Sequence, residues 1–515
     1  MTSVPVIGID LGTTNSVVAY TGSDGTTHVV ADENGERIIP SVVQFNADGS
    51  VVVGKNAKAY AKVEPERVAS VFKRGMGDAT FLPDEKEFVV DGAPQTPEQL
   101  SAIVLKKLAD VASREFGSSA VRAIITVPHY FGEPERAATR SAGEIAGLQV
   151  VQIINEPTAA AIAHGTDGND AREGRLMVFD LGGGTFDVTI MEYGAGREMT
   201  VIASDGDREL GGADFDRKIV ERMIEEARAE RNLELEDDPW LLADAYAQAE
   251  EFKKELSTAE MAKRPLAVGG RPLMFELTRG QFEELIAEEI QFTDDAVRNA
   301  LDKVGGGPPD RVLMVGGSSR IPRFRELVKE ITGIDPTFTK NLDEDVARGA
   351  AMLGAKLDGR LDPRTELAKM PVPQDAASHA VGLQLVRETA HGQMEEFNSV
   401  IIPEGTPTPH SAAHEFYAAS EGQTQIEVVL YEGPDEDIAF CRELGKSQGS
   451  FGRPVPRGYP LRCQVEYTVD QLVVVNMFDG TTSEHICELK VKHDGNLSDE
   501  ERAAARERLV GLTVR

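Results

Sequence analysis

The chain has 515 residues, 41% of them hydrophobic, and its 54 basic and 86 acidic residues give a formal charge of −32. This length exceeds what one hydrophobic core usually serves, so two or three domains are expected. The negative charge disfavours a nucleic-acid partner or an anionic membrane surface, so the sequence predicts neither.

The sequence contains no membrane or export signal that we can identify. No apolar run approaches the roughly 20 residues that span a bilayer, and the N-terminus lacks the charged region and cleavage site of a signal peptide. A cytoplasmic location is therefore predicted. The three cysteines lie late in the chain without a CxxC pair, which predicts buried free thiols in strands at Cys441, Cys463 and Cys487.

Two segments far apart in the chain share one pattern. Residues 6–18 read VIGIDLGTTNSVV, and residues 177–189 read MVFDLGGGTFDVT. Each predicts an apolar strand ending in Asp, a Gly/Thr turn and a second strand, a hairpin whose backbone N–H groups can hold phosphates. A plain tight turn is the alternative for one copy alone. The repeat predicts two related lobes facing one nucleotide, with Asp10 and Asp180 converging on Mg²⁺.

Up to about residue 358, apolar strand patterns alternate with amphipathic helices, which predicts an α/β domain with layered sheets. Thr96 and Pro97 open a helix that runs from Glu98 to Phe116, and Gly117 ends it. Further helices are expected at about 134–147, 241–262, 279–303, 321–332 and 344–357.

Two more motifs of the α/β region fit a nucleotide site. Residues 155–161 read NEPTAAA after an apolar run, which places Glu156 at a strand end where it could order a water molecule. Residues 314–322 read MVGGSSRIP, a strand leading into a Gly-rich turn and a helix that could receive ribose or phosphate. Alone, the second motif is more typical of an ordinary strand-to-helix turn.

The composition changes after residue 358. Residues 359–378 contain three prolines and little periodicity, which is typical of an interdomain linker. Alternating runs between Gly/Pro turns follow, such as residues 425–430 and 472–475, and predict a mostly antiparallel β domain. Ser498 and Glu501 form a capping box that opens one last helix.

Seven segments occur in an order that identifies a family. They are GIDLGTTNSVVA, VPHYFGEPERAAT, IINEPTAAAIAHG, DLGGGTFDVTI, LGGADFD, VGGSSRIP and LDEDVARGAA. The chain resembles the 70-kDa heat-shock chaperones of the DnaK type, densely over residues 4–357 and more thinly over 378–510. The resemblance implies an actin-like, duplicated ribonuclease H-like ATPase domain at 1–358, a linker at 359–377, a peptide-binding β-sandwich at 378–497 and a short helix, a lid remnant, at 498–515.

The resemblance also implies roles for individual residues in ATP hydrolysis. Asp10 and Asp180 would hold the waters around Mg²⁺, and Lys73 would lie near the γ-phosphate. Glu156 and Asp187 would position the attacking water, with Thr185 beside the γ-phosphate; Asp180, Thr185 and Asp187 could also share a K⁺. Such chemistry works by positioning and charge neutralisation, so slow hydrolysis is expected.

The residues expected to bind ATP or ADP come from both lobes. They are Gly12, Thr13, Thr14, Asn15, Gly182, Gly183, Gly184, Gly211, Gly212, Glu250, Lys253, Lys254, Ser257, Gly316, Gly317, Ser318, Arg320 and Asp343. For the charged residues between Glu250 and Lys254, a solvated helix face is the alternative interpretation.

Two further groups of residues are implied by the resemblance. Pro128 and Arg136 would pass nucleotide state between the domains. A cleft for an extended peptide would be lined by Leu383, Phe416, Ala419, Ile426 and Val428. The alternative for these apolar residues is ordinary sandwich core.

Three features depart from the family pattern. The linker has Pro371 and Pro373 in place of a short run of leucines, which puts interdomain coupling in question. Gln152 replaces an arginine of the contact with J-domain cochaperones, so J-domain stimulation is in question too. Only about Ser498 to Val510 follows the sandwich where the family has a helical lid, and an uncovered cleft should release peptide quickly.

The sequence therefore predicts an ATP-hydrolysing, chaperone-like protein that couples nucleotide state to binding of extended apolar polypeptides, with an unfolded client and a nucleotide-exchange factor as partners. Three alternatives stay open. They are a phosphotransferase of the same fold superfamily, such as a sugar kinase, a non-enzymatic scaffold that holds ATP and binds one dedicated partner through its sandwich, and an actin-like filament protein.

Overall fold

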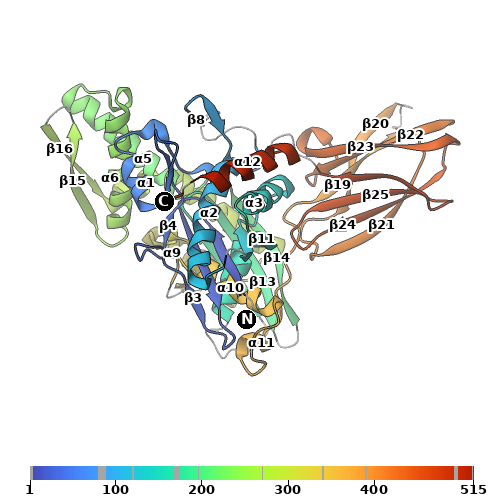
Figure 1. Cartoon of the computed structure of the whole chain (residues 1–515), viewed down its shortest axis with the longest axis horizontal. Helices are drawn as coiled ribbons and strands as arrows, with labels where there is room; N and C mark the ends of the chain where they lie inside the picture. The colour runs from blue at the N-terminus through green and yellow to red at the C-terminus, as the bar shows by residue number, and fades with distance from the viewer. Residues whose placement is uncertain are drawn as a thin grey trace.

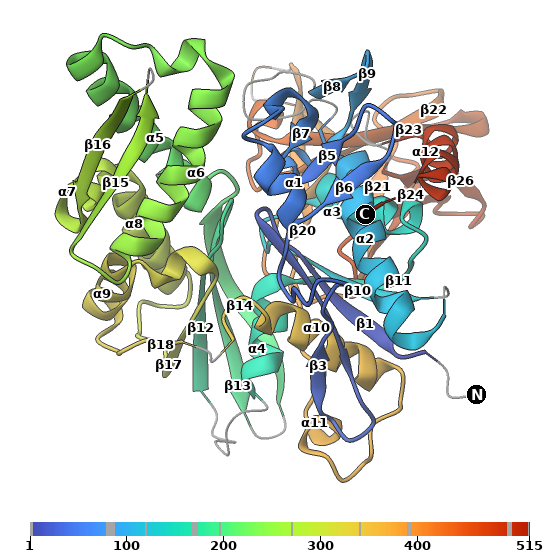
Figure 2. The same ribbon diagram turned by 60° about the vertical axis from the view of Figure 1, so that its left-hand side comes forward.

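The computed structural model describes residues 4–78, 88–118, 121–165, 174–194, 197–268, 271–338, 341–388, 391, 393–491, 497–512 and 514–515. An α/β part extends to Leu357, and an all-β part begins at Val381 and lies to one side of it (Figure 1). The α/β part contains lobe I, residues 4–165, and lobe II, residues 174–338, which stand side by side in Figure 2, and it ends with helix α10 (Asp345–Leu357).

The central sheets of the two lobes have the same topology. Lobe I has the strand order β11-β10-β1-β2-β3, and lobe II has β14-β13-β12-β17-β18. In each, an antiparallel three-strand meander continues into two parallel strands on its other side. The strands are β1 (Val6–Leu11), β2 (Asn15–Thr21), β3 (Thr27–Val29), β10 (Arg122–Val127), β11 (Gln149–Asn155), β12 (Gly174–Leu181), β13 (Phe186–Gly194), β14 (Arg197–Asp207), β17 (Arg311–Val315) and β18 (Thr337–Phe338), with β4 (Ile39–Pro40) pairing with β2. The predicted duplication is confirmed.

Two small-residue helices join the lobes at their base. Helices α4 (Glu156–Gly165) and α10 (Asp345–Leu357) cross so closely that a Cβ added to Gly349 would lie 1.8 Å from the carbonyl oxygen of Ala159. A side chain at Gly349 would therefore force the helices apart, and with them the two hairpins that the lobes carry.

The other helices cover the sheets. They are α1 (Lys55–Tyr60), α2 (Pro97–Phe116), α3 (Glu133–Ile145), α5 (Gly212–Arg231), α6 (Pro239–Leu256), α7 (Arg279–Leu285), α8 (Ala287–Lys303), α9 (Pro322–Thr332) and α11 (Glu366–Lys369), with 3₁₀ turns η1 (Pro65–Arg67), η2 (Phe72–Gly75), η3 (Leu235–Asp237), η4 (Gly317–Arg320) and η5 (Ile438–Phe440). The prediction for α2 is confirmed, because Thr96 and Gln99 form a capping box and Gly117 adopts a left-handed C-cap.

Two helix predictions need correction. The helix expected over 241–262 ends at Leu256, because alternating exposed and buried residues start strand β15 at Met261. The helix expected over 279–303 is interrupted at Ile286, whose ψ of 24° is not helical.

Small sheets complete the upper ends of the lobes. They are β5 (Val43–Phe45), β6 (Val51–Val53) and β7 (Val68–Ala69), then β8 (Phe88–Val90) with β9 (Ala93–Gln95) in lobe I, and β15 (Met261–Val268) with β16 (Arg271–Thr278) in lobe II.

The all-β part is a sandwich of two antiparallel four-stranded sheets. One contains β20 (Met394–Ile402), β19 (Val381–Glu388), β22 (Gln423–Glu432) and β23 (Arg442–Val455), and the other β21 (His410–Tyr417), β24 (Pro460–Tyr467), β25 (Val473–Asp479) and β26 (His485–Lys490). Both sheets contribute to one buried core. Cys463 and Cys487 are buried in strands as predicted, but Cys441 follows η5 outside a strand and is partly exposed.

The segment predicted to be a linker docks on lobe II. The Gln374 backbone N–H donates to the Met199 carbonyl (2.7 Å), and its carbonyl accepts from Val201 N–H (3.5 Å), so the linker extends the edge of β14. Backbone hydrogen bonds of this kind do not depend on side-chain identity. The absence of leucines at this position therefore does not prevent docking.

The last helix, α12 (Asp499–Gly511), lies on lobe I beside α2 and α3, as Figure 1 shows, and not over the sandwich strands. Ala505 and Leu509 enter the core of lobe I. The final residues pair with β6, because Arg515 N–H donates to the Val51 carbonyl and Val53 N–H donates to the Arg515 carbonyl, both at 2.9 Å. Among the helices that the structure describes, none combines the length and the apolar composition that a bilayer span requires.

Candidate active site

The two repeated hairpins meet turn to turn between the lobes. A Cβ added to Gly183 would lie 1.8 Å from Oγ1 of Thr14, and one added to Gly184 would lie 2.4 Å from Cγ2 of Thr13. Glycine is therefore required for the turns to approach each other. The Ser41 hydroxyl donates to the Gly12 carbonyl (2.7 Å) and supports the first turn from behind.

Four carboxylates converge below these turns. Asp10 is the last residue but one of β1, Asp180 and Asp187 face each other on β12 and β13, and Glu156 opens α4. Burial, reinforced by the Glu156 carboxylate, raises the pKa of Asp187 to about 8 and that of Asp10 to about 7. The same causes raise the pKa of Asp180 well above its usual value. Burial and mutual repulsion therefore disfavour the charged forms of these carboxyl groups unless a cation lies among them.

Lys73 is the cation that opposes all three of these pKa shifts. Its side chain is 3% exposed, and Nζ lies 2.6 Å from Oε1 of Glu156. The lysine belongs to η2, which follows Val71 at a φ of 61°. A β-branched residue in this left-handed region is strained by about 1–3 kcal/mol. The surrounding packing therefore holds the lysine segment in place.

The cluster of carboxyl groups fits a bound cation. Oδ1 of Asp187 has no hydrogen-bond partner among the described residues, although the carboxylate is buried. In the described part of the chain, no three His, Cys, Asp or Glu residues form a direct metal site. This donor set suits an ion held mainly through water, as Mg²⁺ often is.

Lobe II places several predicted nucleotide residues together. Lys253 Nζ lies 2.6 Å from the Gly212 carbonyl and 2.7 Å from Asp216, and a Cβ on Gly212 would lie 2.6 Å from Oγ of Ser318. Gly211 packs against Gly184, and Gly316 packs against Asp180. The two halves of the predicted ATP site are thus adjacent.

Other predicted residues lie at the rim. Arg320 pairs with Asp343 at 2.9 Å, and a Cβ on Gly317 would lie 3.6 Å from the same carboxylate. Glu250 accepts from Lys58 of lobe I (2.6 Å) and from Lys254 (2.8 Å). Both ammonium groups outweigh the effect of burial and lower the pKa of Glu250 to about 2. The Ser257 hydroxyl donates to its own helix, at the Lys253 carbonyl, and Asn15 is exposed at the start of β2.

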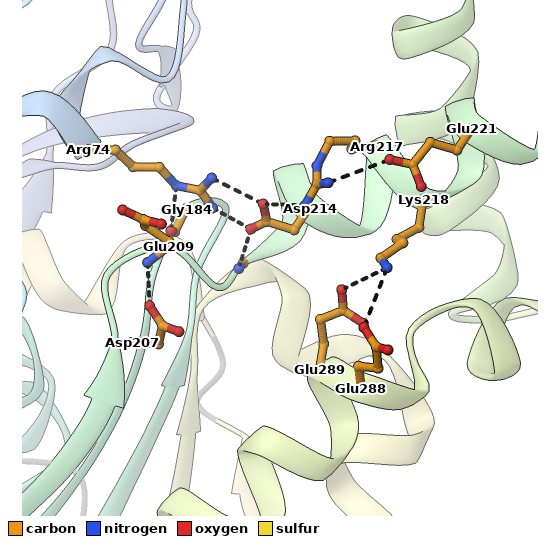
Figure 3. Close-up of polar contacts among 11 residues, drawn as sticks. Arg74, Gly184, Asp207, Glu209, Asp214, Arg217, Lys218, Glu221, Glu288 and Glu289 are labelled. Atoms are coloured by element: carbon orange, nitrogen blue, oxygen red, sulfur yellow. Dashed lines mark hydrogen bonds and ion pairs between the residues drawn. The ribbon is translucent and has the colours of Figure 1, made fainter. Parts of the chain in front are cut away.

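A contact that the sequence analysis did not predict joins the lobes (Figure 3). Arg74 Nε donates to the Gly184 carbonyl (2.8 Å), and its guanidinium makes two hydrogen bonds to Asp214, whose carboxylate also accepts from Gly211 N–H (2.9 Å). Arg74 therefore ties the lysine segment of lobe I to the second hairpin. Two features of the sequence could have indicated this contact. Arg74 directly follows Lys73, and Asp214 is the first aspartate of the LGGADFD motif.

The predicted coupling residues lie where the linker meets lobe I. Arg136 is fully buried and donates to the Phe131 carbonyl (2.7 Å), to Asn155 Oδ1 (2.6 Å) and to Ser378 Oγ (3.2 Å). Pro128 begins the same loop, where its carbonyl accepts from Phe131 N–H (3.2 Å). The guanidinium thus links the end of β11 to the start of the sandwich.

The linker carboxylate of Asp375 is also buried at this junction. It accepts a hydrogen bond from Oγ1 of Thr158 in α4 (2.5 Å) and one from the N–H of Asn155 at the end of β11 (3.4 Å). Burial raises its pKa despite these hydrogen bonds. Because Glu156 lies between Asn155 and Thr158 in the chain, the linker contacts both sides of a site carboxylate.

The residues predicted to line a peptide cleft lie close together in the sandwich. Leu383, Ile426 and Val428 are 3%, 7% and 6% exposed and belong to the core between the sheets. Phe416 packs against this core, and Ala419 is exposed in the turn after β21. In this structure, three of the five side chains are thus covered by the sandwich itself.

The duplicated lobes, the facing hairpins and the lysine among buried carboxylates define an actin-like nucleotide-binding ATPase domain that carries a β-sandwich. The family model described as Hsp70 protein matches residues 6–509. Proteins named Chaperone protein DnaK from Thermotoga petrophila, Thermotoga maritima and Thermotoga neapolitana are each 39% identical over 480 residues, which cover 90% of this chain and 76% of the relative. The chain belongs to the Hsp70 family.

Proposed function

We propose that the protein hydrolyses ATP slowly between its lobes and that nucleotide state controls binding of extended, apolar polypeptide by the sandwich. The observation that carries the proposal is the buried Lys73–Glu156 pair among three aspartates, at the point where two phosphate-binding hairpins meet. Membership of the Hsp70 family supports it.

Each group in the site has a role suited to phosphoryl transfer. Asp10 and Asp180 would hold Mg²⁺ through water, and the bound ion would supply neutralisation of phosphate charge. Lys73 neutralises charge on the γ-phosphate, while Glu156 and Asp187 orient the attacking water. Asp180, Thr185 and Asp187 together offer oxygen ligands for a K⁺.

The docked linker supports coupling between nucleotide and sandwich. Asp375 and Arg136 both contact Asn155, the residue before Glu156. A shift of Glu156 on nucleotide binding would therefore change the contacts that hold the linker. Exchange of nucleotide by a partner protein belongs to this proposal, whereas Gln152 on β11 argues against ordinary J-domain stimulation.

The scaffold alternative is favoured by one observation. Leu383, Ile426 and Val428 are buried in the sandwich core, so an apolar peptide reaches them only if the sheets separate. Fluorescence anisotropy of a labelled, extended peptide measures its affinity for the protein loaded with ATP or with ADP. If ATP changes this packing, the two affinities will differ. Equal affinities, or none, would support a scaffold with one dedicated partner.

The enzymatic part is tested by steady-state ATP turnover. We expect the Lys73→Ala variant to lose at least about a hundredfold in kcat, because it removes the cation beside the transferred group. Lys263→Ala is the matched control, because Lys263 pairs with Glu276 on an exposed hairpin of lobe II. A wild-type rate no higher than that of Lys73→Ala would refute hydrolysis.

A further inference from the structure

The last residues of the sequence complete the small sheet from which the Lys73 segment starts. Strands β6, β5 and β7 lie side by side in that order, and residues 514–515 pair with the other edge of β6, where the end of the chain lies in Figure 2. We propose that residues 497–512 and 514–515, the terminal segment, are a positioning element of the ATP site that holds Lys73 and the first phosphate turn in place. This inference rests on the proposed ATPase function.

The small sheet leads directly to both of these groups. Val43 in β5 pairs with Ala69 in β7, and the chain continues from β7 into η2, which carries Lys73. Just before β5, Ser41 N–H donates to the Thr14 carbonyl of the first phosphate turn at 2.8 Å. A movement of β5 would therefore reach the lysine through β7 and the phosphate turn through Ser41.

The terminal segment supplies the neighbour on the outer side of β6. Arg515 N–H donates to the Val51 carbonyl, and Val53 N–H donates to the Arg515 carbonyl, both at 2.9 Å. On the inner side, Val51 and Val53 pair with Phe45 and Val43 of β5. The same two residues of β6 thus hold both the terminal segment and β5. Without the terminal segment, β6 becomes an open sheet edge, with unpaired N–H and C=O groups.

The terminal segment also packs into the hydrophobic core to which the lysine segment belongs. Leu509 is buried in the same cluster as Phe72, the residue before Lys73. Leu512 and Val514 pack against this cluster. The core that holds Phe72 therefore includes side chains from the last helix and the residues after it.

The lysine segment depends on its surroundings because its backbone is strained. Val71, which directly precedes η2, has a φ of 61°. A β-branched residue keeps such a conformation only where the surrounding structure imposes it. Nζ of Lys73 lies 2.6 Å from Oε1 of Glu156, so relaxation of Val71 would displace the ammonium group from the site.

The first experiment compares kcat and KM for ATP in two variants of Arg515 in the full chain. Arg515→Pro removes the N–H that bonds to the Val51 carbonyl. We expect it to lower kcat about three- to tenfold, because Lys73 is misplaced, and to raise KM about two- to threefold, because the phosphate turn loosens. Arg515→Ala is the matched control, because it leaves both backbone hydrogen bonds intact, and its kcat should stay within about 1.5-fold of the wild type.

A second pair of variants separates positioning from a general loss of stability. Leu509 and Leu148 are 5% and 4% exposed in the same core, but Leu148 lies outside the terminal segment and the small sheet. At a temperature where circular dichroism shows both variants folded, Leu509→Ala should lower kcat at least about threefold. Leu148→Ala should lower it by less than about 1.5-fold.

The outcomes separate this inference from the ATPase itself. Equal kcat and KM in Arg515→Pro and Arg515→Ala, or equal losses in Leu509→Ala and Leu148→Ala, would overturn the inference while a Lys73-dependent wild-type rate upheld the ATPase. A wild type without Lys73-dependent turnover would overturn both.

Discussion

Arg74 shows how a single side chain completes a site that two lobes share. Its guanidinium spans from the lysine segment to the Gly184 turn and to Asp214, as Figure 3 shows. Bidentate Arg–carboxylate contacts combine charge with fixed geometry. Arg74 therefore holds the hairpin of β12 and β13 against lobe I.

Substitution of Arg74 should weaken nucleotide binding. We expect Arg74→Ala to raise the Kd for ATP about tenfold, equivalent to about 1.4 kcal/mol, measured by isothermal titration calorimetry. Arg217→Ala is the matched control, since Arg217 approaches the same Asp214 carboxylate at 3.5 Å from within lobe II. Equal effects of the two variants would mean that Arg74 does not act by joining the lobes.

The buried aspartates predict a pH dependence of stability without nucleotide. Folding raises the pKa of Asp187 from 3.8 to about 8 and that of Asp10 to about 7, so between these values the native state holds protons that the unfolded chain has released. The free energy of unfolding should therefore fall as pH rises from about 5 to about 8. Asp187→Asn should show a shallower fall in denaturant titrations. Identical slopes for the two proteins would contradict the assignment.

At the scale of single elements, α12 is a structural part of lobe I. Leu509 is 5% exposed in the lobe core, whereas its neighbour Val510 is 76% exposed. Leu509→Ala should cost about 2–4 kcal/mol of unfolding free energy in urea titrations, and Val510→Ala should change it by less than about 0.5 kcal/mol. Similar small effects at both positions would show that α12 detaches from lobe I in solution.

The linker behaves as an edge strand rather than a free connector. Gln374 pairs with Met199 and Val201 through backbone atoms, and Asp375 is held by Thr158. The prolines of this segment indicated a linker but not the pairing, because strand addition at a sheet edge leaves no side-chain pattern.

On the scale of the whole molecule, local rules predicted the lobes and the hairpins well. The Asp-Gly-Thr repeat placed Asp10 and Asp180, and the capping box placed the start of α2. Contacts between distant segments were not predictable, since Arg74 meets Asp214 and Arg442 meets Glu135 only after domains pack. The burial of Ile426 and Val428 also follows from sheet packing, because cleft and core residues share one apolar alternation.

The domains themselves are joined by several independent contacts. The Arg140 guanidinium pairs with Asp470, which also accepts a hydrogen bond from Ile153 N–H (2.8 Å). Nε2 of His379 donates a hydrogen bond to the Tyr130 carbonyl (2.7 Å). These contacts lie on the same face of lobe I as the linker junction at Asn155. The sandwich is therefore held on lobe I by contacts outside the linker as well as by the linker itself.

The rate of ATP hydrolysis with and without an extended apolar peptide measures directly whether ATP chemistry and the sandwich are coupled. We expect a Lys73-dependent rate that saturating peptide changes severalfold, because peptide binding opens the sandwich core and alters its contacts with lobe I. A Lys73-dependent rate that is identical with and without peptide would contradict the coupling, and the sandwich would then serve a fixed partner.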